Sequence, residues 1–309
     1  MNGILIINKE KGFTSHDVVA KLRGILHTKK IGHTGTLDPD AVGVLPVCIG
    51  RATKVCSLLT DTDKTYEAVI RFGVITDTLD MTGQILEKRP VQVTKEQLVE
   101  ALAAFVGEIE QLPPMYSAVK VNGKRLYELA RKGQEVERKK RRITIHELTL
   151  LSEKLEEALC SIRVICSKGT YIRSLCADIG ERLGCGAAMQ SLIRTKAGGF
   201  SIGQARTLSE VEALCRTQKP EDFLLPVDTV FMQYRSILVK GRAMHFLLNG
   251  NPIAASLVAI NAPRDNVPED NVPKDGEMVR VYGEDGSFYA IYRYEKESER
   301  YRVVKMLHD

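Results

Sequence analysis

The sequence predicts an α+β fold, in which a mixed, mainly antiparallel central sheet is flanked by helices and followed by a small β-rich domain. Strand-like and helix-like segments do not alternate regularly, which argues against a doubly wound fold with a parallel sheet. The apolar pattern breaks at 218–229, and the residues beyond it resemble short strands with one helical piece near 240–248. We therefore expect a larger domain at 1–229 and a smaller one at 230–309.

Hydrophobic spacing and capping residues place the first elements. Apolar residues at helical spacing follow Thr14 and Ser15, either of which can cap a helix. The other elements expected in this part are a strand at 3–8, a glycine-rich loop at 32–43, a buried strand at 44–49 and a short helix at 52–59.

Alternation and turn signals place the later elements. Residues 64–74 alternate between apolar and polar side chains, as a half-buried strand does. Two capping boxes, Thr94 with Gln97 and Thr207 with Glu210, open helices that end near 106 and 215. The remaining expected elements are a strand at 116–121 leading into a tight Asn122-Gly123 hairpin, a helix at 125–132 ending at Gly133, strands at 142–151 and 158–166, and a helix from 170 to 184.

Charge is concentrated in one segment. The chain carries a net charge of +5, but residues 118–145 alone contain ten basic side chains and three acidic ones. A patch of this kind suits a phosphate backbone. A solvated hairpin and helix would have the same composition, so charge alone leaves both interpretations open.

Several classes of protein lack support. The seven cysteines form no Cys-x-x-Cys pair, which favours reduced thiols in a cytoplasmic protein. No segment is long enough to cross a bilayer, and the apolar run at 3–7 is too short for a signal peptide. Phosphate-loop and dinucleotide fingerprints are missing, and the six histidines lack metal-ligand spacing. We expect no cofactor, no metal and no membrane partner.

Residues 199–203 match the Gly-x-Ser-x-Gly pattern of serine hydrolases, with Ser201 as the nucleophile. That pattern requires a buried strand directly before it, whereas a polar and glycine-containing stretch precedes it here. A glycine-rich turn is the better interpretation.

A second glycine-rich loop, at 32–39, has more chemical potential. Its glycines permit close approach of a ligand, and Pro39 pushes Asp38 towards an extended conformation. An exposed aspartate in a loop is usually a turn residue. An aspartate can also attack an electrophilic carbon and form a covalent intermediate.

Four long motifs, in order, resemble those of the TruB-type tRNA pseudouridine synthases. They are Asn8-Lys-Glu-Lys-Gly-Phe-Thr-Ser15, Gly32-His-Thr-Gly-Thr-Leu-Asp-Pro39, Gln111-Leu-Pro-Pro-Met-Tyr-Ser-Ala-Val-Lys120 with Asn122-Gly-Lys-Arg-Leu-Tyr127, and Gly169-Thr-Tyr-Ile-Arg-Ser-Leu175. The resemblance covers residues 3 to about 203. The last part of the chain is more weakly similar to the PUA domain, a small RNA-binding domain.

The resemblance implies roles for individual residues. Asp38 is the expected nucleophile, and Arg173 is expected to pair with it and keep it ionised by lowering its pKa. Tyr66 is expected to stack on the target uracil and help to remove the proton from its carbon. The remaining substrate-binding positions implied by the family are His33, which fills the space left by the flipped base, Tyr171 and Leu192 in the pocket, and Lys9 on the RNA.

The resemblance also implies a substrate. The family isomerises uridine 55 in the T loop of tRNA, and its stand-alone bacterial type needs no guide RNA. The base must leave its stack to be reached. We accordingly expect a cytoplasmic, monomeric isomerase that binds tRNA through its 118–145 segment and its C-terminal domain. Whether Asp38 attacks the sugar or the base is left open.

Two positions depart from the family pattern. Glu10 stands where proline is usual, and Ile193 stands where a second arginine is common. An RNA-binding or RNA-folding protein with secondary catalysis is the alternative function, because basic patches support it equally. The joint presence of Asp38, Tyr66 and Arg173 favours the enzyme.

Overall fold

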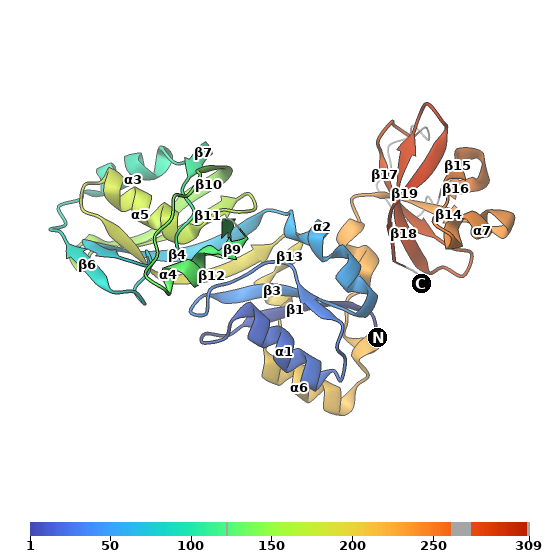
Figure 1. The fold of residues 1–309 in the computed structure, drawn as a ribbon, viewed down its shortest axis with the longest axis horizontal. Coiled ribbons are helices and arrows are strands. Elements are labelled where there is room, and N and C mark those ends of the chain that lie inside the picture. The colour runs from blue at the N-terminus through green and yellow to red at the C-terminus, as the bar shows by residue number, and fades with distance from the viewer. Residues whose placement is uncertain (122, 261–272, 308–309) are drawn as a thin grey trace.

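A computed structural model describes residues 1–121, 123–260 and 273–307, with the side chain of residue 260 excluded. Figure 1 shows two bodies, a long sheet covered by helices and a smaller β domain at the other end of the molecule. The larger sheet contains β1 (Gly3–Lys9), β2 (Ile31–His33), β3 (Val42–Ile49), β4 (Lys64–Phe72), β7 (Gly107–Gln111), β10 (Arg141–Lys154), β11 (Leu159–Cys166), β12 (Ala187–Ala197) and β13 (Phe200–Ser201).

The smaller sheet and two short hairpins account for the other described strands. The smaller sheet contains β14 (Arg235–Val239), β15 (Ile253–Ala254), β16 (Val258–Ile260), β17 (Met278–Tyr282), β18 (Phe288–Glu295) and β19 (Arg300–Met306). The hairpins pair β5 (Val74–Thr76) with β6 (Ile85–Lys88), and β8 (Lys120–Val121) with β9 (Lys124–Arg125).

The helices are short. The α-helices are α1 (Ser15–Ile25), α2 (Cys56–Thr60), α3 (Lys95–Ala103), α4 (Leu126–Ala130), α5 (Ile172–Arg182), α6 (Leu208–Thr217) and α7 (Met244–Leu248). The 3₁₀ helices are η1 (Gly50–Val55), η2 (Leu155–Glu157), η3 (Ile202–Gln204), η4 (Pro220–Asp222), η5 (Val227–Phe231), η6 (Gly241–Ala243) and η7 (Ala255–Leu257).

The larger sheet runs in the order β1-β3-β12-β4-β11-β10-β7, and its pairs are antiparallel except for β3 with β12. At that parallel contact Gly43 has φ +104, and a Cβ there would lie 2.3 Å from the carbonyl oxygen of Arg194. Only glycine lets the two backbones approach so closely. The mainly antiparallel α+β architecture predicted from the sequence is confirmed.

Strands β1 and β3 are buried on both faces. Alternate residues such as Leu5 and Val47 pack against α1 and α6, while Ile4 and Val44 pack against a second cluster that includes Phe200. This explains why the strands are continuous apolar runs in the sequence. Strand β4 alternates instead, because one face packs under α3 and α5 and the other is partly exposed.

Most of the expected elements are present with small shifts in their ends. The predicted strand at 116–121 is the main correction, because only Lys120 and Val121 are in a strand. The preceding carbonyl groups bind elsewhere: Ser117 accepts from the Tyr127 amide and Val119 from the Leu126 amide. The tight hairpin is confirmed by the pairing of β8 with β9, although residue 122 lies outside the described residues.

The predicted helix at 52–59 is split between η1 and α2. Most of the Asp-Asn-Val-Pro near-repeat at 265–274 lies outside the described residues.

The smaller sheet packs against the larger body through a shared apolar cluster. Phe231 of η5, Ile291 of β18 and Leu307 surround Val55 of η1, with Leu59 of α2 beside them. Tyr282 of β17 also donates a 2.6 Å hydrogen bond to Asp228 of η5. The C-terminal β domain is therefore attached next to α2, which Figure 1 shows between the two bodies.

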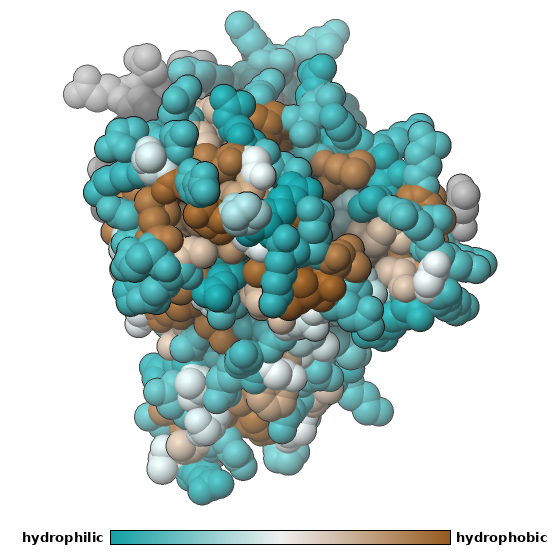
Figure 2. All heavy atoms as spheres, turned by 90° about the vertical axis from the view of Figure 1, so that its left-hand side faces the viewer, coloured by the Kyte–Doolittle hydropathy of each residue, from teal (hydrophilic) through white to brown (hydrophobic). Residues whose placement is uncertain are grey.

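Figure 2 shows the opposite end of the molecule, where apolar side chains are scattered among hydrophilic ones. Exposed apolar residues occur in β6, where Leu86 is 65% exposed, and in α3, where Val99 is 49% exposed. Scattered apolar residues of this kind are normal on a protein surface. Within the described residues, no helix is both long and apolar enough to cross a membrane.

Candidate active site

The loop that carries Asp38 connects β2 to β3, and the N-terminal motif holds it from both sides. The Leu37 amide donates a 2.9 Å hydrogen bond to the Ser15 hydroxyl, which in turn lies 3.4 Å from the Leu37 carbonyl oxygen. On the other side, the Gly12 amide donates to the Pro39 carbonyl at 2.9 Å. The residues that flank Asp38 in the chain are therefore fixed before any substrate binds.

Lys9 belongs to this support and does not fit the predicted RNA contact. Its side chain is fully buried at the end of β1, and its ammonium group donates to three carbonyl groups, of Glu10, Phe13 and Pro39, at 3.1, 2.6 and 3.0 Å. Burial lowers the pKa of Lys9 to about 8, which leaves it mainly protonated at neutral pH. A buried cation with three carbonyl acceptors cannot also reach a phosphate, so the placement corrects the prediction.

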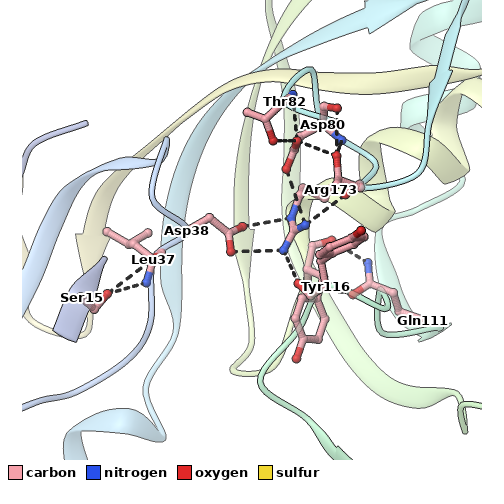
Figure 3. Close-up of polar contacts among 10 residues, drawn as sticks. Ser15, Leu37, Asp38, Asp80, Thr82, Gln111, Tyr116 and Arg173 are labelled. Atoms are coloured by element: carbon pink, nitrogen blue, oxygen red, sulfur yellow. Dashed lines mark hydrogen bonds and ion pairs between the residues drawn. The ribbon is translucent and has the colours of Figure 1, made fainter. Parts of the chain in front are cut away.

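Arg173 binds Asp38 with two parallel contacts. Its Nε lies 3.0 Å from Oδ2 of Asp38, and its Nη2 donates to Oδ1 at 3.1 Å (Figure 3). Arg173 comes from the first turn of α5, is 6% exposed, and also donates to the carbonyl oxygen of Tyr116 at 2.7 Å. Such a bidentate pair fixes the direction of a carboxylate as well as its charge.

A second carboxylate, Asp80, also contacts Arg173, and the sequence gives no indication of it. Oδ2 of Asp80 lies 3.5 Å from Nη1 of Arg173, and that Nη1 also donates to the Thr78 carbonyl at 3.0 Å. The amide and hydroxyl of Thr82 donate to Oδ1 of Asp80 at 3.0 and 2.6 Å (Figure 3). In the sequence this stretch is a threonine-rich turn, and nothing in it indicates that it lies beside Asp38.

The charge of Asp38 is set by opposing influences. Burial raises the pKa of Asp38, the charge of Arg173 lowers it, and the charge of Asp80 raises it again. The net effect is a raised pKa of Asp38, although its side chain is 40% exposed at the mouth of the pocket. The prediction that Arg173 lowers the pKa identified one cause correctly but missed the larger effect of burial.

Asp38 and Arg173 lie at a pocket of 260 Å³ whose wall includes Tyr66, Leu192 and Tyr171. Tyr66 and Leu192 come from the adjacent strands β4 and β12 and are 8% and 7% exposed. The tertiary structure therefore brings together five of the predicted site residues from four separate parts of the chain. A small recess with tyrosine and leucine side chains beside a fixed carboxylate suits a single planar base.

Tyr171 is held through its backbone. The side chain of Gln111 accepts from the Tyr171 amide at 2.8 Å and donates to its carbonyl oxygen at 3.0 Å. Gln111 is the first residue of the third family motif, and the resemblance implies no role for it. Its two hydrogen bonds to the Tyr171 backbone explain why an amide side chain stands at this position. Ser174 adds a hydrogen bond from its hydroxyl to the Leu112 carbonyl at 3.1 Å.

His33 stands at the end of β2, outside the wall of this pocket. Its Nδ1 lies 3.1 Å from the carbonyl oxygen of Gly35, and burial lowers its pKa. The lowered pKa favours the neutral form of the ring at physiological pH. Ile193 points to the other face of β12 from Leu192 and is 40% exposed, so this departure from the family pattern lies away from the pocket.

The basic segment is mostly exposed. Lys139, Lys140, Arg141 and Arg142 are all exposed at the start of β10 and just before it. Arg138 differs from them, because it donates to the Pro113 carbonyl at 3.1 Å and lies 3.3 Å from Glu135. Four cations of the run are exposed to solvent, and the fifth helps to hold the segment in place.

The alternative site at Ser201 lacks a catalytic setting. Ser201 is exposed at the end of β13, and its hydroxyl bonds to the Gln204 side chain at 3.2 Å. The segment caps a 3₁₀ turn and does not form a strand-to-helix elbow. Among the described residues, no group of three or more His, Cys, Asp or Glu side chains is arranged to hold a metal ion.

Comparison with known proteins decides between the enzyme and a binding protein of similar charge. Residues 23–172 match the model of the TruB family pseudouridylate synthase N-terminal domain, and residues 173–232 match that of the tRNA pseudouridylate synthase B C-terminal domain. The tRNA pseudouridine synthase B of Lachnoclostridium phytofermentans is 50% identical over 99% of both chains. The chain belongs to the TruB family. The family's members are tRNA pseudouridine synthases, which are isomerases.

Other relatives agree with this TruB assignment. The tRNA pseudouridine synthase B of Alkaliphilus oremlandii is 43% identical over 99% of each chain. Among solved structures, a chain of a Cbf5-Nop10-Gar1 complex matches with a TM-score of 0.73 and 26% identity, covering 99% of this chain and 85% of the other. The six-stranded C-terminal sheet forms a nearly closed, barrel-like β domain, consistent with the PUA-like domain that the sequence predicts.

Proposed function

We propose that this TruB family member isomerises uridine 55 in the T loop of tRNA, with Asp38 as the nucleophile. The observation that carries the proposal is the bidentate contact of Asp38 with Arg173 at the mouth of a pocket for one base. Asp38 is the carboxylate of this pocket with substantial exposure, at 40%, whereas Asp80 behind it is 13% exposed.

The positions of the side chains support the following chemistry. The target base is flipped into the pocket, at a cost of a few kcal/mol for unstacking. Asp38 opens the glycosidic bond, the base turns, and it rejoins the sugar through carbon. Tyr66 stacks on the uracil and helps to remove the proton from that carbon, while Tyr171 and Leu192 hold the ring in place. His33 fills the space that the base leaves in the RNA.

RNA binding is assigned to two surfaces. The exposed cations at 139–142 bind phosphates of the stem, and the C-terminal β domain adds a second contact. We divide the chain at 229/230, within η5 and shortly before β14, into a catalytic and an RNA-binding domain. We further propose that the protein acts in the cytoplasm as a monomer, without a guide RNA.

The substitution Asp38→Asn tests the nucleophile. We expect it to abolish pseudouridine formation, because an amide cannot attack carbon, and to leave tRNA affinity nearly unchanged, because the side chain keeps its size. Pseudouridine is mapped at single-nucleotide resolution in unmodified tRNA, alongside filter binding. Residual activity in this variant would remove Asp38 as nucleophile, and a modified uridine other than 55 would change the proposed substrate position.

The substitution Asp17→Asn serves as the matched control. Asp17 is an exposed carboxylate of α1 that caps its helix through Thr14. The substitution Asp17→Asn removes one negative charge, as Asp38→Asn does, but does not alter the pocket, so activity should persist.

A further inference from the structure

Arg194 is a buried cation without a carboxylate partner in the described structure. It lies on β12, is 2% exposed, and is among the largest fully buried side chains of the protein. Its Nε donates to the Val44 carbonyl at 2.7 Å, whereas its Nη2 has no hydrogen-bond partner among the described residues. Burying a guanidinium is costly unless an anionic group compensates it.

The carboxylates of the pocket do not provide this compensation. Asp38 and Asp80 both lie against Arg173. Another basic group, Lys64, lies close to Arg194. Burial is the main cause that lowers the pKa of Lys64 to about 8, and the charge of Arg194 lowers it further. The pocket thus carries an excess of positive charge before the substrate binds.

Arg194 lies at the base-binding wall of the pocket. In the register of β4 with β12, Arg194 is opposite Tyr66 and Leu192 is opposite Ala68, so the arginine shares the pocket face with the two proposed base contacts. Tyr66 and Arg194 are cross-strand neighbours, and the charge of Arg194 opposes the rise that burial causes in the pKa of the Tyr66 phenol. The phosphates of a flipped nucleotide remain at the pocket mouth, whereas its base enters most deeply.

The isomerisation creates negative charge on that base. When the bond between C1′ and N1 breaks, its electron pair stays with the uracil and is shared among N1, O2 and O4. The base then attacks C1′ through C5, which releases Asp38 where it is bound to C1′ and gives a neutral ring with a tetrahedral C5. Loss of the C5 proton and gain of a proton at N1 then restore the conjugation of the ring. Between the breaking of the bond to N1 and the formation of the bond to C5, the uracil is an anion in a pocket of low dielectric, where fixed charges act strongly.

We propose that Arg194 is the fixed positive charge that stabilises this uracil anion and positions Tyr66 beside it. The inference rests on the proposed function only in requiring that the glycosidic bond is broken in this pocket. Arg194 acts through its field and through Tyr66, while Arg173 is occupied by Asp38. A buried cation that has no carboxylate partner among the described residues is thereby compensated during the reaction.

The test compares Arg194→Gln, which removes the charge, with Arg194→Lys, which keeps it. We expect the single-turnover rate of Arg194→Gln to fall by about 10²-fold or more, as for loss of a preorganised charge-stabilising group, with tRNA affinity within about twofold of wild type. Arg194→Lys should keep most of the rate. Both variants lose the contact from Nε to Val44, so a purely structural role would impair them equally in rate and thermal midpoint.

The control is Arg163→Gln. Arg163 lies on β11 in the same sheet, is 44% exposed, and binds Glu67 on the outer face at 3.0 Å. Its replacement removes one positive charge without altering the pocket. We expect wild-type rates on both substrates described next.

Leaving-group chemistry supplies a readout that structure alone would not change. A tRNA with 5-fluorouridine at the target carries a more acidic base, whose anion needs less stabilisation. The loss of glycosidic cleavage in Arg194→Gln should therefore be several-fold smaller on this substrate than on uridine, measured by nucleoside analysis of single-turnover samples. Equal losses on the two substrates, or a loss confined to tRNA affinity as expected of a phosphate contact, would overturn the proposal.

The position of the target is mapped in the wild-type protein first. If it is not uridine 55, the proposed substrate position fails, and the comparison of variants is made at the uridine that is modified. The two ideas can therefore fail separately.

Discussion

The charge on Asp38 depends on its burial and on two residues, Arg173 and Asp80, which approach it only in the folded chain. Burial of the carboxyl group favours its neutral form, Arg173 favours the ionised form, and Asp80 opposes ionisation while orienting Arg173. A nucleophile must be ionised to attack, so the raised pKa affects activity at the acid end of the pH range. Arg173 limits that effect and directs the carboxylate into the pocket.

The pH profile tests this balance. Activity is lost as pH falls through the raised pKa of Asp38, because the protonated acid is not a nucleophile. Replacing Arg173 by Met removes the cation that lowers this pKa, so the acid limb should move to higher pH while the maximal rate falls. Single-turnover rates across acid and neutral pH measure both. An acid limb that stays in place or moves to lower pH would mean that another group controls it.

At the scale of elements, the first motif is a support for the second. The end of β1, the turn after it and the start of α1 provide Lys9, Gly12 and Ser15, which bind the backbone on both sides of Asp38. The loop from β2 to β3 is glycine-rich and would be mobile by composition. The loop is held by hydrogen bonds to the N-terminal segment. This explains why the first family motif matters for the nucleophile although it lies far from Asp38 in the sequence.

Removing the Ser15 hydroxyl should loosen this loop. Ser15→Ala leaves the buried Leu37 amide without its acceptor, at a cost of about 1–3 kcal/mol. We expect a lower free energy of unfolding in urea and a reduced single-turnover rate, with tRNA affinity retained. Ser201→Ala is the matched control, because Ser201 is exposed and binds only a surface glutamine among the described contacts.

The two serine variants also distinguish a pseudouridine synthase that uses Asp38 from a hydrolase that uses Ser201. A full rate in Ser15→Ala would show that the hydrogen bond does not position Asp38. A loss of activity in Ser201→Ala would revive the hydrolase-like site. The expected result is the reverse in each case.

At the scale of the whole molecule, the two parts that we propose to bind RNA are attached to the body that contains the larger sheet. The exposed cations at 139–142 begin β10, which pairs with both β7 and β11. The C-terminal β domain is joined through the cluster around Phe231 to η1 and α2. Thr60, at the end of α2, lies in the wall of the active-site pocket, so this junction and the site share an element.

Neutralising the exposed cations Lys139, Lys140, Arg141 and Arg142 as glutamines should weaken tRNA binding and its dependence on salt. Each phosphate contact contributes about 0.7–0.9 to the slope of log affinity against log salt, so the slope should fall by up to about 3. Binding is measured at several salt concentrations. Arg138 is left intact because it holds Pro113. An unchanged slope would identify the segment as a solvated surface.

The sequence by itself determined the α+β class, the capped helices at Thr14, Thr94 and Thr207, and the resemblance that points to Asp38 and Arg173. These features are local or contained in a contiguous motif, and short-range chemistry specifies them. Tertiary structure alone decided that Lys9 is buried, that Asp80 supports Arg173 and that Arg194 lacks a carboxylate partner among the described residues. Such relations depend on distances between segments far apart in the chain, and so does the desolvation that raises the pKa of Asp38.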